Sequence, residues 1–130
     1  MRATVLTHVV VLALLMGCAT AQISELGSPE PISPRPGVSF DHFPRITELR
    51  WHPVPSVSSY SIEIDCFHCC EVGKWCSDVD KPRIRVSGIT TTTYTFNWVG
   101  ANLGRWRVWA VAADGKEGPK SAWQDFLYTR

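Results

Sequence analysis

The sequence predicts an all-β domain, a seven-stranded antiparallel β-sandwich, on three observations. Short stretches of alternating apolar and polar residues recur along the second two thirds of the chain, and turn residues separate them about every ten residues. No stretch shows the 3.6-residue apolar period of a helix. The clearest strand lies in residues 104–115, where Trp106, Val108 and Ala110 share one side before the Asp114-Gly115 turn. Such a series of strands is typical of two packed sheets.

The first 21 residues have the layout of a secretory signal peptide. Arg2 supplies a positive start, and residues 5–15 form an apolar run interrupted by Thr7 and His8. This run is too short to cross a bilayer, so we do not expect a transmembrane anchor.

Two cleavage sites compete within this segment. Residues 19–21 (Ala-Thr-Ala) fit cleavage before residue 22, whereas Leu15, Met16, Gly17 and Cys18 resemble a bacterial lipobox that would leave a lipidated Cys18 at the mature N-terminus. Both alternatives predict an extracytoplasmic protein. It would be lipid-anchored at the cell envelope in one case and secreted or periplasmic in the other.

Residues 22–44 predict a proline-rich linker. They lack periodic apolar positions and contain five prolines, at 29, 31, 34, 36 and 44. Proline at this density favours an extended, semi-rigid chain, so we expect a spacer before a folded domain at 45–130.

The domain can be divided into strands in chain order. The first is expected to begin near His42 and Phe43, and the others lie at 46–53, 60–66, 83–88, 91–98, 104–115 and 122–128. Pro53 and Pro55 end the first long strand because proline cannot donate to a continuing ladder. Four tryptophans on apolar faces are expected in the core: Trp51, Trp98, Trp106 and Trp123.

The order of five short motifs resembles a fibronectin type III domain of the bacterial extracytoplasmic type. The motifs lie at 49–53, 60–64, 93–96, 106–110 and 118–126, and the resemblance covers about residues 44–129. It implies a sandwich with the Trp51 strand in one sheet and the Tyr60 and Trp106 strands in the other. The sequence departs from the family at two places. Gly104 stands near a position where the family often has tyrosine, and a cysteine-rich insertion occupies residues 66–80.

The insertion contains Cys66, Cys69, Cys70 and Cys76. In an exported protein these cysteines predict two disulfides that stabilise a loop. A bridge between the neighbours Cys69 and Cys70 would be strained. Two connectivities therefore stay open: Cys66 with Cys69 and Cys70 with Cys76, or Cys66 with Cys70 and Cys69 with Cys76. The alternatives are a zinc site that includes His68 and a redox-active cysteine pair.

Charged and aromatic residues on outward strand faces give the candidate binding surface. Glu63 and Asp65 are expected to form cross-strand ion pairs with Arg105 and Arg107, rather than the carboxylate pair of a glycosidase. Trp109 points outward beside these arginines, and Trp75 lies in the cysteine insertion. An exposed tryptophan can stack on a sugar ring, fill a partner's pocket or lie under an arginine as a cation–π pair.

Charge and motif content exclude several function classes. Thirteen basic residues face twelve acidic ones, and loss of Arg2 with the signal peptide makes them equal. This balance, without any basic run, argues against nucleic-acid binding, and it limits membrane contact to a lipid anchor at Cys18. No phosphate-binding glycine loop, H-E-x-x-H motif or nucleophile–histidine frame is present, so we expect neither an enzyme nor a cofactor.

The sequence predicts an exported module for protein–protein or protein–surface contact at the cell envelope. A carbohydrate-binding module and a redox or metal-binding protein are the alternatives.

Overall fold

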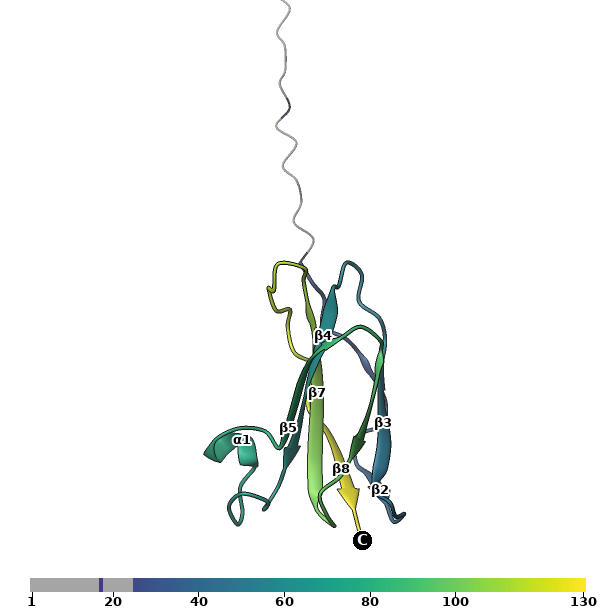
Figure 1. Ribbon diagram of the computed structural model, residues 1–130, viewed down its shortest axis with the longest axis vertical. Helices are drawn as coiled ribbons and strands as arrows, with labels where there is room; N and C mark the ends of the chain where they lie inside the picture. Colours follow the sequence, from purple (N-terminus) through teal and green to yellow (C-terminus); the bar gives the residue numbers. More distant parts are fainter. Residues whose placement is uncertain (1–16, 18–24) are drawn as a thin grey trace, which may run out of the picture.

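Two β-sheets face each other in the computed structural model, which describes Gly17 and residues 25–130 (Figure 1). The elements of the described residues are β1 (Pro31–Ser33), β2 (Val38–Phe40), β3 (Ile46–Trp51), β4 (Ser59–Cys66), α1 (Cys76–Val79), β5 (Ile84–Ile89), β6 (Thr93–Asn97), β7 (Leu103–Val111) and β8 (Gln124–Tyr128). The predicted signal peptide at 1–21, with the candidate lipidation residue Cys18, lies outside the described residues except for Gly17.

The strands form a three-stranded sheet with the order β1-β3-β6 and a five-stranded sheet with the order β2-β8-β7-β4-β5. Paired strands are antiparallel except for β2 and β8, which run parallel. The longest pairing joins β4 to β7, from Ser59 opposite Val111 to Cys66 opposite Gly104. The predicted sandwich is therefore confirmed, with the Trp51 strand in one sheet and the Tyr60 and Trp106 strands in the other. It has eight strands in the described residues rather than seven.

Two of the eight strands, β1 and β2, come from the segment that we expected to be a linker, so the linker prediction is wrong from Pro29 onward. The strand expected near His42 and Phe43 is not formed, because β2 ends at Phe40. Pro31 pairs with Trp51 in β3, and Val38–Phe40 pairs with β8. Pro29 and Pro34 are buried. Strands of three residues are too short to show alternation, and edge strands tolerate proline because one row of their N–H groups faces away from the sheet. Residues 22–24 lie outside the described part of the chain.

The core lies between the sheets and consists of the alternate side chains that the sequence predicted. Its largest fully buried members include Leu49, Trp51, Ile62, Ile64, Trp106, Val108, Phe126 and Tyr128. The aromatic rings meet across the two sheets, with Trp51 at 5.4 Å from Tyr60 and Phe96 at 5.6 Å from Phe126 between centroids. Burial of these side chains is the main favourable term in the folding of the domain.

Gly104 is required by close packing at the start of β7. A Cβ atom at this position would lie 2.6 Å from Cε2 of Phe126 and 2.8 Å from Cζ2 of Trp98. Both distances are shorter than van der Waals contact, so a larger residue would displace the core rings. Gly104 therefore stands near the position where the family resemblance would favour tyrosine, because the rings of Trp98 and Phe126 fill the space at the start of β7.

The two ends of the sandwich differ in what they present. The described chain enters the fold near Glu25 and Leu26, beside the loop that joins β7 and β8. The cysteine-rich insertion and α1 lie toward the other end, where the C-terminus also lies (Figure 1). No helical segment of residues 25–130 is long and apolar enough for a membrane crossing.

Candidate binding surface

The four cysteines of the insertion are paired in one of the two connectivities that the sequence left open. Cys66 is paired with Cys69 and Cys70 with Cys76, with Cα atoms 5.6 and 5.2 Å apart. Cys66 and Cys76 are fully buried, whereas Cys69 and Cys70 are exposed. Each disulfide therefore joins an exposed loop position to a buried position at the edge of the core.

Residues 67–75, which we call the cysteine loop, are also held by contacts that do not involve sulfur. Phe67 forms an isolated β-bridge with Trp75, and their ring centroids lie 5.2 Å apart. The amide of His68 donates to the carbonyl of Lys74 at 3.0 Å. Nδ1 of His68 accepts from the amide of Gly73 at 2.5 Å. Gly73 has a φ of 78°, a conformation that glycine adopts without strain.

The tip of the cysteine loop exposes Val72 more fully than any other large apolar residue of the described chain, at 85%. Glu71 and Lys74 form an exposed ion pair at 3.1 Å on either side of it. A single apolar side chain is thus displayed on a short loop that two disulfides and a β-bridge hold in place. In the sequence, the only signal for it is one valine among polar residues.

The base of the loop is attached to the sheet through Asp65, which is completely buried. Its carboxylate accepts hydrogen bonds from the amide and the hydroxyl of Ser77 at 3.0 and 2.5 Å. It also accepts from Nε and a terminal nitrogen of Arg105 at 3.2 and 3.0 Å. Asp65 therefore links β4, α1 and β7. Sequence reasoning missed Ser77 because nothing in the pattern places α1 above β4.

Beside Asp65, aromatic rings and guanidinium groups cover the outer face of the five-stranded sheet. The guanidinium carbon of Arg105 lies 4.1 Å from the ring centroid of Trp75 and 4.2 Å from that of Trp123. Arg107 lies 4.1 Å from Trp123 and forms an ion pair with Glu63 at 2.8 Å. We call this series, Trp75, Arg105, Trp123 and Arg107, the tryptophan–arginine ladder. Cation–π contacts of this kind contribute about 0.5–2 kcal/mol each.

The ion pairs predicted between β4 and β7 are present, but they are not exposed as we expected. Glu63 pairs with Arg107 and Asp65 with Arg105, a register that the sequence pattern had left open. Both carboxylates, however, are buried. Glu63 also contacts Arg85 and Lys120, at 3.4 and 3.5 Å, and the rings of Trp75 and Trp123 lie against the arginines that pair with the two carboxylates. The prediction that Trp123 belongs to the core is also wrong, since its ring lies on the outer face and is only partly buried.

Trp109 is the main correction to the predicted binding surface. It points to the outer face as expected, but only 1% of its surface is exposed. The ammonium group of Lys120 lies 4.3 Å from its ring centroid, and the guanidinium group of Arg85 lies 5.7 Å away. These two side chains cover the indole, so Trp109 cannot serve as an open stacking platform.

The predicted metal alternative finds no support in residues 25–130. No group of three or more His, Cys, Asp or Glu side chains within them is arranged to hold a metal ion. The four cysteines that would supply thiolates are paired with each other.

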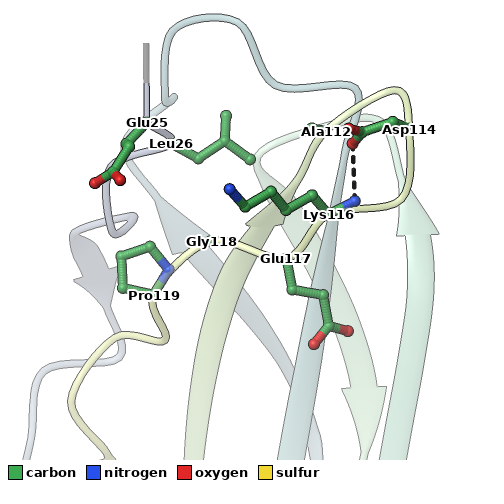
Figure 2. Close-up of a pocket in the computed structure, with 8 residues that line it drawn as sticks. All are labelled: Glu25, Leu26, Ala112, Asp114, Lys116, Glu117, Gly118 and Pro119. Carbon is green, nitrogen blue, oxygen red and sulfur yellow. Dashed lines mark hydrogen bonds between the residues drawn. The ribbon is translucent and has the colours of Figure 1, made fainter. Parts of the chain in front are cut away.

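A separate pocket of about 290 Å³ lies at the other end of the sandwich (Figure 2). It forms where Leu26 packs against the turn around Gly118, a contact that no sequence pattern indicates. In that turn the carboxylate of Asp114 accepts a hydrogen bond from the amide of Lys116 at 2.9 Å. The charged side chains around the pocket are exposed and of both signs, so the pocket indicates no particular ligand.

The sheet order, the buried aromatic core and the single parallel pair define a β-sandwich of the immunoglobulin-like class. Within that class the fold is fibronectin type III-like. A search of solved structures finds an Fn3-like protein from Clostridium thermocellum at 20% sequence identity and a TM-score of 0.51, with 81% of this chain and 92% of that chain covered. No protein-family model and no curated protein matches the sequence. At this identity the similarity concerns the fold alone.

Proposed function

We propose that this protein is an exported, non-enzymatic module that binds a protein partner at the cell envelope through its cysteine loop. The observation that carries the proposal is the 85% exposure of Val72 at the tip of a loop that two disulfides hold to the sheet. A loop ordered before binding loses little conformational entropy when it docks, and an apolar side chain at its centre can fill a partner's pocket.

Two features support export. The cysteines lie at disulfide distance, and disulfides persist in oxidising compartments outside the cytoplasm. The first 21 residues have the layout of a signal peptide, with the choice between a lipidated Cys18 and a mature chain from residue 22 still open. Labelling with radioactive palmitate distinguishes these two forms, because only the lipoprotein takes up the label.

The contacts of Trp109 and Trp123 favour a protein partner over a carbohydrate. A sugar-binding platform needs an open indole face. Trp109 is buried under Lys120 and Arg85, and Trp123 contacts the guanidinium groups of both Arg105 and Arg107. Both indoles are therefore occupied by cationic side chains of the domain itself.

Site-specific photo-crosslinking in intact cells tests the proposal. A photoreactive amino acid at position 72 should give a defined protein adduct. The same amino acid at position 114, which is exposed at the opposite end of the sandwich, should not. Added wild-type protein should compete for the adduct, whereas the Val72→Asp variant should compete about tenfold less well or worse. The proposal is overturned if positions 72 and 114 give the same adducts, or if Val72→Asp competes as well as the wild type.

A further inference from the structure

The free edge of β6 is the second surface of this domain that is suited to a partner. β6 is the last strand of its sheet, and its pairing with β3 is regular over all five residues. The amide of Trp51 donates to the carbonyl of Thr92, and the amide of Trp98 donates to the carbonyl of Arg45. Residues 92, 94, 96 and 98 therefore direct their backbone groups to β3. Because backbone direction alternates along a strand, Thr93, Thr95 and Asn97 direct theirs to the open edge.

These outward groups are almost all free within the part of the chain that the structure describes. The one hydrogen bond on them joins the hydroxyl of Thr91 to the carbonyl of Thr93 at 3.1 Å. Unpaired backbone groups in an extended row are a template for another strand.

The other strand edges of the described sandwich are protected in ways that β6 is not. β1 and β2 are only three residues long. β5 has arginine at position 85, a glycine with a φ of 74° at position 88 and an irregular register with β4. Charge, bulges and short length are the usual protections of an edge. β6 has no charged residue, no proline and no positive φ.

The side chains of β6 are complementary to a second copy of the same strand in one antiparallel register. With Thr95 opposite Thr95 of the second copy, Thr93 meets Asn97 and Tyr94 meets Phe96. The first two pairs join neutral hydrogen-bonding groups on the outer face, and the third joins aromatic rings on the core face, where Tyr94 is only half-buried. Cross-strand pairs of these types are favourable, and no like charges meet.

We propose that two copies of the protein associate edge to edge through β6, so that the three-stranded sheet continues across a two-fold axis at Thr95. Each directly opposed pair of Thr93, Thr95 and Asn97 exchanges both backbone hydrogen bonds in this arrangement. A two-fold interface uses the same patch on both copies, as this register requires.

A charge-swap experiment on the exported full-length protein tests the proposal by sedimentation equilibrium. The wild type should show a concentration-dependent monomer–dimer equilibrium. Thr95→Lys and Thr95→Glu should each raise the dimer dissociation constant about tenfold or more, because like charges then meet on the two-fold axis. An equimolar mixture of the two variants should recover dimers that weaken as salt is added.

Two further variants serve as controls. Ser87→Lys places the same charge on the β5 edge and should leave dimerisation unchanged. Thr95→Pro removes the outward N–H, should weaken the dimer and is tolerated on an edge strand. The proposal is overturned if the wild type is monomeric at every concentration, or if Thr95→Lys dimerises like the wild type. In the first case the partner of the β6 edge would be an extended segment other than a second β6. Val72→Asp should leave the dimer intact, so this proposal and that for the cysteine loop can fail separately.

Discussion

Asp65 shows how one residue connects the cysteine loop to the sandwich. It is an ionisable side chain with no exposed surface, and such a group persists only when charge and hydrogen bonds compensate its lost hydration. Arg105 supplies the charge, and Ser77 supplies two of the donors. The residue therefore fixes the position of α1 and, with it, the direction in which the cysteine loop leaves the sheet.

Asp65→Ala should lower the free energy of unfolding by about 3–5 kcal/mol, because it leaves Arg105 and the amide of Ser77 without their buried partner. The matched control is Glu48→Ala, since Glu48 is about half exposed and pairs with Arg50 at 3.8 Å. Its loss should cost about 0–1 kcal/mol. Urea unfolding followed by tryptophan fluorescence measures both variants. Equal losses in the two would contradict the structural role assigned to Asp65.

At the scale of single residues, the sequence predicted the ion pairs between β4 and β7 but not the burial of their carboxylates. Alternation along β4 and β7 was enough to place Glu63 and Asp65 on the same face as Arg105 and Arg107, and the register of the two strands then opposes Glu63 to Arg107 and Asp65 to Arg105. Arg85 of β5 and Lys120 add to the pairing of Glu63, and Trp75 and Trp123 lie against the two arginines; of these four residues, Trp75, Trp123 and Lys120 lie in irregular segments. No periodicity exists there to predict which way a side chain points, and the predicted exposure of Trp109 failed for the same reason.

At the scale of elements, the cysteine loop determines which disulfide pairing forms. Cys66 ends β4 and Cys76 begins α1, so the buried members of the two bridges are placed by regular structure. Spacing alone could exclude a bridge between Cys69 and Cys70 but could not choose between the remaining connectivities. The choice depends on how residues 67–75 fold back, which Phe67 and Trp75 determine through their β-bridge.

Partial reduction at acidic pH followed by alkylation and fragmentation should identify the pairing. Acid suppresses thiolate and therefore limits exchange between bridges during the experiment. Singly reduced molecules should carry label on Cys66 and Cys69 together, or on Cys70 and Cys76 together. Label on Cys66 with Cys70 would establish the other connectivity and contradict the loop geometry described above. Fully reduced and alkylated protein provides the reference for complete labelling.

Elements with several alternating residues were predictable, whereas the shortest ones were not. β3, β4 and β7 have six to nine residues, and each shows apolar side chains on one face that a sequence pattern can reveal. β1 and β2 have three residues each and lie among prolines that favour an extended chain in any context. Their place in the sheets depends on pairing with β3 and β8, which the residues of β1 and β2 do not reveal by themselves.

At the scale of the whole molecule, the fold separates the point of chain entry from the proposed contact surface. If Cys18 is lipidated, the seven residues from it to Glu25 can reach at most about 25 Å. The membrane would then lie near the end that holds the β7–β8 loop, and the cysteine loop would face away from it (Figure 1). Antiparallel pairing through β6 places the two entry points at opposite ends. A dimer of two lipidated copies could then attach both lipid groups to one membrane only if the strands of the dimer run parallel to the membrane surface.

The inclusion of β1 and β2 in the sandwich predicts that the domain needs its N-terminal segment. A chain that begins at residue 45 would lose the backbone bonds from His52 to Glu30 and from Thr129 to Phe40, and would expose both sheet edges that the segment covers. Its melting temperature should fall by roughly 15 °C or more, because several kcal/mol of stability are lost from a small domain. A chain that begins at Glu25 is the matched control and should melt at the same temperature as the full-length protein. Thermal unfolding followed by circular dichroism gives the melting temperatures of all three proteins. Equal values for the chains that begin at residues 25 and 45 would show that residues 25–44 act only as a linker.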